Sequence, residues 1–259
     1  MILLGLALAT TPWERTGELR VRDADALVVP DVAQRAELGA LVRDLVRAAP
    51  SGAVPAGLPE RASALGLSLD VSDGIALLGS NAGWGLLAVR LGPASPWVVQ
   101  APHPWFDLGT GELTGLLFAE SDARAALFAT THRKLADTTD AAHQAEGGFQ
   151  TLTLALMDAL EDPVLVQIHG FGGGHTGADV VVGGWGAASL TEGLTTLGWV
   201  AADGKAVPSL AGSTNLQVRA LAGRAPVAHL ELNKATRTAL RDDPALRARL
   251  WAVLKAWAR

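Results

Sequence analysis

The feature that most constrains the fold is a continuous apolar run, Pro163 to Ile168 (PVLVQI), which ends at His169. A strand with one face in water alternates apolar and polar residues, whereas a strand covered on both faces is apolar along its length. Strands of the second kind belong to parallel sheets with helices packed on either side. The run therefore predicts a central strand of an α/β protein.

Strand-like and helical patterns alternate along the rest of the chain. We expect strands at 67–71, 74–79, 85–91, 97–101, 125–131 and 225–232, and helices at 31–49, 111–120, 150–160, 190–198 and, as one or two helices, 236–258. Asp31 is the expected N-cap of the helix at 31–49, and the linker 92–96 (GPASP) suits a hairpin. The alternation predicts a three-layer α/β/α sandwich around a mixed, mostly parallel sheet.

Polar residues gather where three of the predicted strands end. The three clusters contain His103 with Asp107, His169 with His175, and His229 with Glu231 and Asn233. The members of the last cluster alternate, so they lie on one face of their strand. Ligands of α/β proteins bind beyond the carboxyl ends of the strands. These clusters are therefore the candidates for a functional site.

The chain contains no cysteine, so any catalytic metal must be held by His, Asp or Glu side chains. A zinc hydrolase needs about three such ligands and one open position for water. It also needs a separate carboxylate that moves protons. Two histidines, one aspartate and one glutamate at the ends of three strands can supply that set.

Each of these residues, taken alone, also has a purely structural interpretation. His103, beside prolines, fits a capped surface residue, and His169 can simply hydrogen-bond a loop. Glu231 stands in an apolar strand and must be paired if it is buried. A salt bridge to Arg133 or Arg237 would satisfy it.

As an ordered set, the motifs resemble those of the phage poly-γ-glutamate hydrolases, part of a wider zinc carboxypeptidase-like and N-formylglutamate amidohydrolase-like group. That family shows P-H-G-G-x-I-E-x-G-T before a helix, then an apolar strand ending in I-H-G, a V-G-G segment, N-x-x-N, and Q-L-E-L followed by an Arg. The matching residues here are Pro102–Thr110 (PHPWFDLGT), Ile168–Gly170, Val182–Gly184, Asn215, His229–Leu232 and Arg237. Order and strand context agree over about residues 97–240.

The resemblance implies that His103, Asp107 and His169 hold one zinc ion and that Glu231 is the general base. The chain departs from the family at the metal carboxylate, where Asp107 replaces Glu and lies one residue closer to the histidine. Bulky residues, Pro104 to Phe106, replace the family's glycines and would narrow the cleft.

Substrate-binding residues are also implied by the resemblance. Carboxypeptidase-like enzymes use an Arg to hold the substrate carboxylate or the oxyanion, and Arg133 is the candidate because its planar fork suits a carboxylate. An ion pair of Arg133 with Asp137 or Asp140 is the structural alternative. Arg237 and His229, which replaces a Gln of the family, are further candidates for substrate binding.

The N-terminus contains a short apolar run, Ile2 to Ala9 (ILLGLALA), that ends in an A-x-A-like sequence but has no preceding Lys or Arg. We expect residues 1–20 to include a short signal or leader segment, with a buried first strand as the alternative, and 21–259 to form one domain. The protein is then periplasmic or secreted if the run is a signal remnant, and cytoplasmic otherwise. No other segment has the character of a transmembrane helix.

Composition narrows the functional classes. The net charge is −5 and no stripe of Lys or Arg is present, so we expect no nucleic-acid partner. There is no G-x-S-x-G elbow, and the glycines from Gly170 to Gly174 match neither a dinucleotide fingerprint nor a P-loop. The sequence predicts a zinc-dependent amidohydrolase or carboxypeptidase-like metalloprotease that acts on an anionic small-molecule or peptide substrate. The alternative is a non-catalytic binding module on the same fold.

Overall fold

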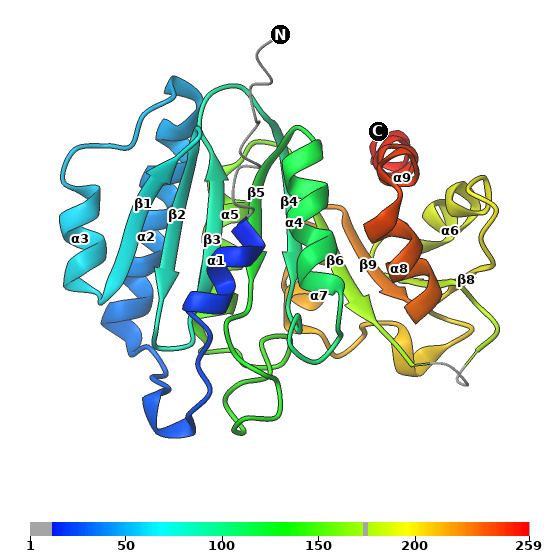
Figure 1. Cartoon of the computed structure of the whole chain (residues 1–259), viewed down its shortest axis with the longest axis horizontal. Helices are drawn as coiled ribbons and strands as arrows, with labels where there is room; N and C mark the ends of the chain where they lie inside the picture. Colours follow the sequence, from blue (N-terminus) through cyan, green and yellow to red (C-terminus); the bar gives the residue numbers. More distant parts are fainter. Residues whose placement is uncertain (1–11, 173–175, 259) are drawn as a thin grey trace, which may run out of the picture.

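A single nine-stranded mixed sheet organises the protein (Figure 1). The structure, a computed structural model, describes residues 12–172 and 176–258. The strand order is β1-β2-β3-β5-β4-β6-β9-β7-β8. The strands are β1 (Leu67–Ser72), β2 (Ile75–Ser80), β3 (Gly85–Arg90), β4 (Ser95–Ala101), β5 (Ala123–Phe128), β6 (Val164–Gly170), β7 (Val180–Gly183), β8 (Ala201–Asp203) and β9 (Val227–Leu232).

The four central strands, β5, β4, β6 and β9, run parallel to one another. On one side of them, β3, β2 and β1 form an antiparallel meander. On the other side, β7 pairs antiparallel with β9 and β8 pairs parallel with β7. The predicted α/β class and the sheet that is parallel at its centre are confirmed.

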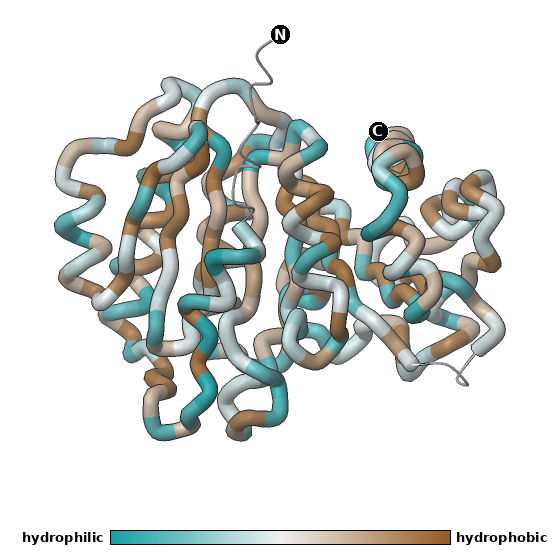
Figure 2. The backbone as a smooth tube through the Cα atoms, viewed as in Figure 1, coloured by the Kyte–Doolittle hydropathy of each residue, from teal (hydrophilic) through white to brown (hydrophobic). Residues whose placement is uncertain are grey.

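Helices cover both faces of the sheet. The helices are α1 (Pro12–Glu18), α2 (Val32–Ala48), α3 (Leu58–Ala64), α4 (Thr110–Glu120), α5 (Gly148–Ala159), α6 (Ala187–Thr195), α7 (Leu216–Leu221), α8 (Lys234–Asp242) and α9 (Pro244–Trp257). One core cluster joins α2, α3, α5 and α7 to the sheet, and a second joins α4, α6, α8 and α9 to the opposite face. Figure 2 shows hydrophobic residues recurring along the strands and helices, with hydrophilic residues frequent in the loops below the sheet.

Strand β6 shows why its sequence is apolar almost throughout. Leu165 belongs to the core on one face, and Val166 and Ile168 belong to the core on the other. All three side chains are fully buried, so both faces of the strand are covered, as the sequence predicts. The exception is Gln167, whose buried amide is hydrogen-bonded to other buried side chains.

The predicted hairpin across residues 92–96 is wrong, because β5 lies between β3 and β4 in the sheet. Residues at the start of β5 hold the connecting segment in place through hydrogen bonds. The Nη1 atom of Arg124 donates to the carbonyl oxygens of Arg90 and Gly92, at 2.6 and 2.8 Å. Ser95 N donates to Asp122 O at 2.8 Å. The segment therefore crosses the end of β5 and does not turn back on β3.

Local capping agrees with the sequence at two helices. The Asp31 side chain accepts a hydrogen bond from Gln34 N, and the Gln34 side chain accepts one from Asp31 N, a capping box that starts α2. The C-terminal helical segment is divided at Asp243, which caps α9 directly before Pro244. A proline suits the first turn of a helix but cannot continue the preceding one, which explains the break.

The N-terminal helix α1 packs on α4. Trp13 lies against Gly111, where a Cβ atom would be only 2.2 Å from the indole, and its ring centroid is 4.8 Å from that of Trp105. The apolar run Ile2–Ala9 lies outside the described residues, so its role as a leader stays a prediction. Among the helices of residues 12–172 and 176–258, none is both long and apolar enough to cross a membrane.

Candidate metal-binding and catalytic site

The candidate site lies at the carboxyl ends of β4, β6 and β9, three neighbours in the parallel part of the sheet. His103 is the second residue after β4, and His169 is the penultimate residue of β6. In the register of β6 and β9, Gln167 pairs with His229 and His169 pairs with Glu231. Cross-strand partners share a face of the sheet, so all four side chains are on one side. The parallel sheet thus gathers residues that are far apart in the sequence.

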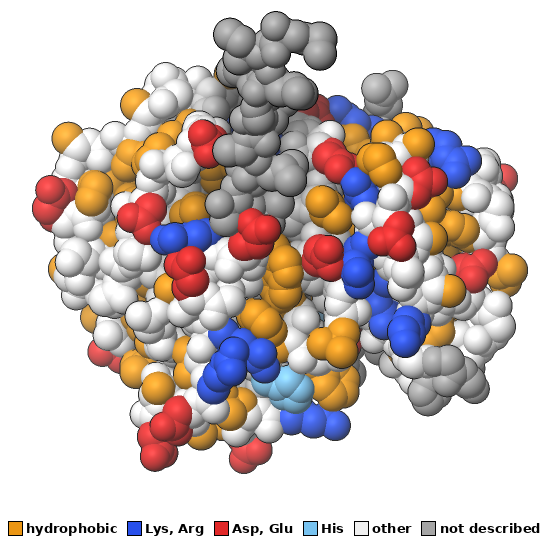
Figure 3. All heavy atoms as spheres, viewed as in Figure 1, with side chains coloured by type: hydrophobic (Ala, Val, Ile, Leu, Met, Phe, Trp, Pro, Cys, Tyr) orange, Lys and Arg blue, Asp and Glu red, His pale blue; other side chains and the backbone are white. Residues whose placement is uncertain are grey.

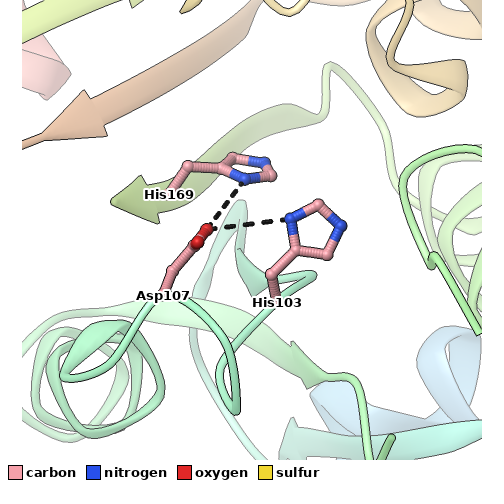
Figure 4. Close-up of side chains that lie close together, drawn as sticks. All are labelled: His103, Asp107 and His169. Atoms are coloured by element: carbon pink, nitrogen blue, oxygen red, sulfur yellow. Dashed lines mark ion pairs between the residues drawn. The ribbon is translucent and has the colours of Figure 1, made fainter. Parts of the chain in front are cut away.

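His103, Asp107 and His169 converge as the sequence predicts (Figure 4). Oδ2 of Asp107 is 3.7 Å from Nδ1 of His103 and 3.4 Å from Nδ1 of His169. All three side chains are buried, with exposed fractions of 2%, 6% and 3% in chain order. One ligand atom from each residue lies within 4.8 Å of the others.

These positions fit a metal ion with a short coordination shell. Tetrahedral zinc with bonds of about 2.0–2.2 Å places its ligand atoms about 3.4 Å from one another. The separations from Asp107 to the two histidines are 3.7 and 3.4 Å, and all three ligand atoms lie within 4.8 Å, so a metal would draw the side chains somewhat closer together. The three residues can therefore hold a divalent metal ion.

A short helical turn explains how Asp107 reaches the site with a side chain shorter than glutamate. Asp107 N donates to His103 O at 2.8 Å, which places the two side chains on the same side of a turn. Gly170 N donates to Oδ2 of Asp107 at 3.2 Å and orients the carboxylate. The spacing of four residues between His103 and Asp107 is therefore compatible with a common ligand.

Asp140 lies on the other side of the His103 ring. Its Oδ1 atom is 2.8 Å from Nε2 of His103 and 3.1 Å from Nδ1 of His143. The carboxylate also accepts a hydrogen bond from Nη2 of Arg133. With Nε2–H donating to Asp140, the lone pair of His103 is on Nδ1, the nitrogen that faces Asp107 and His169.

Arg133 lies beside His103 and forms the ion pair with Asp140 that was the structural alternative to substrate binding. Its Nη1 atom is 3.3 Å from Nδ1 of His103. Nδ1 of His103 is also the atom that would bind a metal, so the Arg133 guanidinium would have to move away from Nδ1 for a metal to bind there. The Arg133 side chain is about one quarter exposed, which leaves it room to move.

The local charges set the protonation of the three candidate ligands. Burial lowers the pKa of His103, but hydrogen bonds to Asp107 and Asp140 outweigh it and raise the pKa overall. Burial raises the pKa of Asp107, yet the two histidines hold it well below its usual range. Burial and neighbouring His229 lower the pKa of His169 to about 4. At neutral pH the site thus contains an ionised carboxylate and a neutral His169.

Glu231 and His229 form a second pair beside His169. Nε2 of His229 is 3.5 Å from Oε1 of Glu231, and the His229 ring centroid is 4.5 Å from that of His169. Burial raises the pKa of Glu231, while the contact with His229 lowers it, and the net direction is down. The carboxylate is therefore ionised and able to accept a proton. Its partner is His229, and neither Arg133 nor Arg237 forms an ion pair with it within the described residues.

Arg237 is a buried side chain that links the backbone segments around the site. It is 8% exposed and donates to three backbone carbonyl oxygens, those of Leu108, Phe171 and Leu232. Gly170 leaves space for it, because a Cβ atom there would be 2.3 Å from Nη1 of Arg237. The arginine thus joins the loop that follows Asp107 to the ends of β6 and β9.

A buried network of amides, which the sequence patterns did not single out, lies beneath His229. Gln167 Nε2 donates to Gln100 and Gln217 at 3.1 and 3.2 Å, and its Oε1 accepts from Asn215 at 3.0 Å. The same oxygen lies 3.4 Å from Nδ1 of His229. The signal in the sequence was a Gln inside each of two apolar strands, VLVQI and WVVQA, since a buried amide must find partners.

No protein-family model matches the chain, and no curated protein matches it. Solved structures do match. An N-formylglutamate amidohydrolase from Ralstonia eutropha JMP134 is 14% identical, with 65% of this chain and 96% of that chain covered and a TM-score of 0.44. The zinc-free apo form of YndL is 19% identical, with coverage of 65% and 88% and a TM-score of 0.46. A bacteriophage poly-γ-glutamate hydrolase is 15% identical, with coverage of 66% and 84% and a TM-score of 0.43.

These structures include both kinds of protein that the sequence motifs resemble. Because the identities and TM-scores are low, we base the functional proposal on the residues of the site.

Other residues singled out from the sequence have different positions. Asn233 and Asn215 are N-caps, of α8 and α7, and His132 lies against the ring of Phe106. His175 lies outside the described residues. The structure thus gathers His103, Asp107 and His169 into one cluster, with Glu231 beside His169 in the sheet, and gives other residues structural roles.

Proposed function

We propose that the protein is a zinc-dependent hydrolase of an amide, peptide or isopeptide bond, with a substrate that bears a carboxylate. One observation supports this above all. Two imidazoles lie within 3.7 Å of a single buried carboxylate oxygen, and an ionised glutamate, Glu231, pairs with one of them, His169, in the sheet. A metalloprotease or amidohydrolase needs the same set of groups.

In this proposal His103, Asp107 and His169 hold the metal and Glu231 is the general base. When bound, zinc supplies a Lewis acid for a carbonyl oxygen and makes water a stronger acid. Glu231 accepts the proton of the attacking water and passes it to the leaving amine. His229 lies beside the Glu231 carboxylate, with its Nε2 atom 3.5 Å from Oε1, and would be its partner as it gains and loses the proton. Arg133 holds the oxyanion or the substrate carboxylate once it leaves His103.

The test combines metal analysis with turnover. We expect about one zinc per chain in protein purified with zinc, and hydrolysis of some member of a panel of N-acyl amino acids and γ-glutamyl peptides. His103→Ala should lose the metal. Glu231→Gln should keep it but lower kcat by about 10²–10⁴-fold, the usual contribution of a general base.

The matched control is Glu192→Gln, an exposed carboxylate on α6 that lies outside the site, and it should leave kcat unchanged. Protein that binds no zinc, or activity that survives both His103→Ala and Glu231→Gln, would contradict the proposal. Binding of carboxylate ligands without turnover by metal-loaded protein would instead identify a non-catalytic binding module.

A further inference from the structure

The turn that holds two of the three candidate metal ligands cannot keep its shape by itself. Residues 103–107 form one helical turn, closed by hydrogen bonds from Phe106 N and Asp107 N to His103 O at 3.0 and 2.8 Å. A single turn is unstable in isolation, because so few hydrogen bonds do not offset the entropy lost by fixing its backbone. The geometry of His103 and Asp107 therefore depends on contacts between the turn and the rest of the protein.

Trp105 anchors the turn on the side away from the ligands. Residues two apart in a helical turn do not face each other, so the Trp105 side chain leaves the turn in a different direction from His103 and Asp107. Its Nε1 atom donates to the carbonyl oxygen of Ala129, just beyond β5, at 3.1 Å. Neighbouring segments can therefore hold the turn through this indole.

The same indole contacts the segment of residues 12–21, which we call the N-terminal strap. The ring centroids of Trp13 and Trp105 are 4.8 Å apart, with an angle of 35° between the rings. The guanidinium carbon of Arg20 lies 4.2 Å from the centroid of the Trp105 ring, within the range of a cation–π contact. Two residues of the strap thus contact one side chain of the turn that carries the ligands.

The strap is itself fixed to the domain along its length. At its start, Trp13 occupies the space that Gly111 leaves on α4. In its middle, the Thr16 side chain is fully buried. At its end, Val21 N donates to Thr130 O at 2.9 Å. A segment that is held at both ends can keep the turn in place.

The contact between the strap and the turn lies at the surface of the molecule. In the orientation of Figure 1, Figure 3 shows hydrophobic side chains between α1 and α4, with basic side chains and a histidine below them. Trp13 and Trp105 are both half-buried. A smaller apolar residue at position 13 should therefore remove the ring contact while the fold survives.

We propose that the N-terminal strap positions the metal-binding turn through Trp105, so that Trp13 and Arg20 set the metal affinity of the site without touching the metal. The proposal rests on the proposed function only in taking His103 and Asp107 as metal ligands. Residues around a metal site alter its affinity by about 10- to 100-fold when they orient the ligands. Loss of either strap contact should therefore weaken metal binding.

The first experiment compares two tryptophan pairs near opposite ends of β4. Trp251 packs on Trp97, near the start of this strand, with ring centroids 4.9 Å apart, and it is half-buried like Trp13. Trp13→Leu and Trp251→Leu each remove one indole from such a pair, so both should lower the melting temperature. Only Trp13→Leu should lower zinc affinity, by about tenfold or more in competition with a chelating dye. Trp13→Phe should restore most of that affinity.

The second experiment reports on the turn with no metal present. Hydrogen exchange of the Phe106 and Asp107 amides measures how often the turn opens. In metal-free protein, Trp13→Leu and Arg20→Met should speed this exchange by about tenfold relative to Trp251→Leu, the effect expected from the loss of one aromatic contact.

Two results would overturn the strap as a positioning element. These are equal zinc affinities in Trp13→Leu and Trp251→Leu, or exchange of the residue 106 and 107 amides at the same rate in the two variants. A wild-type protein that binds no zinc would refute the proposed function, whereas faster exchange in Trp13→Leu would still support the strap. Zinc binding that depends on Trp13 in a protein without hydrolytic activity would also support the strap and refute the hydrolase.

Discussion

Single residues decide whether the site can hold a metal. His103 presents Nδ1 to Asp107 and His169 because its Nε2 atom is 2.8 Å from Oδ1 of Asp140. A carboxylate at that distance fixes the ring orientation and raises the basicity of the other nitrogen, as around many metal-binding histidines. Asp140 is therefore a positioning residue for His103 and no ligand itself.

Replacing Asp140 should weaken metal binding without removing a ligand. We expect Asp140→Asn to lower zinc affinity by about 10- to 100-fold, the usual effect of losing such a partner, as measured by competition with a chelating dye. Asp137→Asn, an exposed aspartate in the same loop, is the matched control and should leave the affinity unchanged. Equal affinities in the two variants would show that Asp140 does not position His103.

Gly170 leaves no room for a larger side chain at the site. An alanine there would bring its Cβ atom to 2.3 Å from the guanidinium of Arg237, which is held by three carbonyl oxygens. Gly170→Ala should therefore displace the backbone whose N–H orients Asp107. It should lower both the melting temperature and the zinc affinity, measured by calorimetry and chelator competition.

A neighbouring glycine gives the control for this substitution. Nothing lies within 4 Å of a Cβ atom built on Gly172, so Gly172→Ala should change neither the melting temperature nor the zinc affinity. A Gly170→Ala protein that behaves like Gly172→Ala would mean that Arg237 does not constrain the end of β6.

The arrangement of the strands and helices determines which side chains come together at the site. The parallel pairing of β4, β6 and β9 brings their carboxyl ends together, and the register of β6 and β9 places His169 beside Glu231. Helix α8 follows β9 after a single capping residue, Asn233. That short connection puts the first turn of α8 next to the site, which explains why Lys234 and Arg237 line a pocket together with Asp107.

The buried amide side chains also connect separate strands and helices. Gln100 on β4, Gln167 on β6 and Gln217 on α7 are linked by hydrogen bonds, and Gln217 also donates to Ala141 O in the loop that carries Asp140. Buried amides are costly unless they are satisfied, so the network fixes the relative positions of strands, helix and loop. Because the network contacts both His229 and the loop that carries Asp140, it links the positions of these two residues.

At the scale of the whole molecule, burial of the site makes stability depend on pH. The pKa of His169 is lowered to about 4, whereas an unfolded histidine titrates near 6.5. The unfolded chain therefore binds more protons than the folded protein between these values, and His169 makes folding less favourable as pH falls through this window. The total effect of this residue is on the order of 3 kcal/mol.

Metal-free protein should thus lose stability between pH 6.5 and 4, and His169→Gln should lose less, as measured by denaturant unfolding at a series of pH values. His103 has a raised pKa and acts in the opposite sense, so its contribution partly offsets that of His169. The carboxylates Asp107 and Asp140 have lowered pKa values, and their stabilisation is lost only below about pH 4. His132→Gln is the control, and a pH slope for it that matches His169→Gln would contradict the assignment.

The sequence by itself determined the α/β class, the central strand β6, the capped start of α2 and the identity of the candidate ligands. These depend on local patterns, namely apolar runs, capping residues and polar residues at strand ends, which short-range physics fixes.

Only the tertiary structure decided how those residues are used. The place of β5 between β3 and β4, the pairing of Arg133 with Asp140 and the commitment of Arg237 to backbone carbonyl oxygens all depend on contacts distant in sequence. Such contacts leave no pattern in the local sequence, because the same charged residue can face a substrate, a carboxylate or a carbonyl oxygen. For the same reason, the place of Lys234 in a pocket that Asp107 also lines follows only from the folded chain.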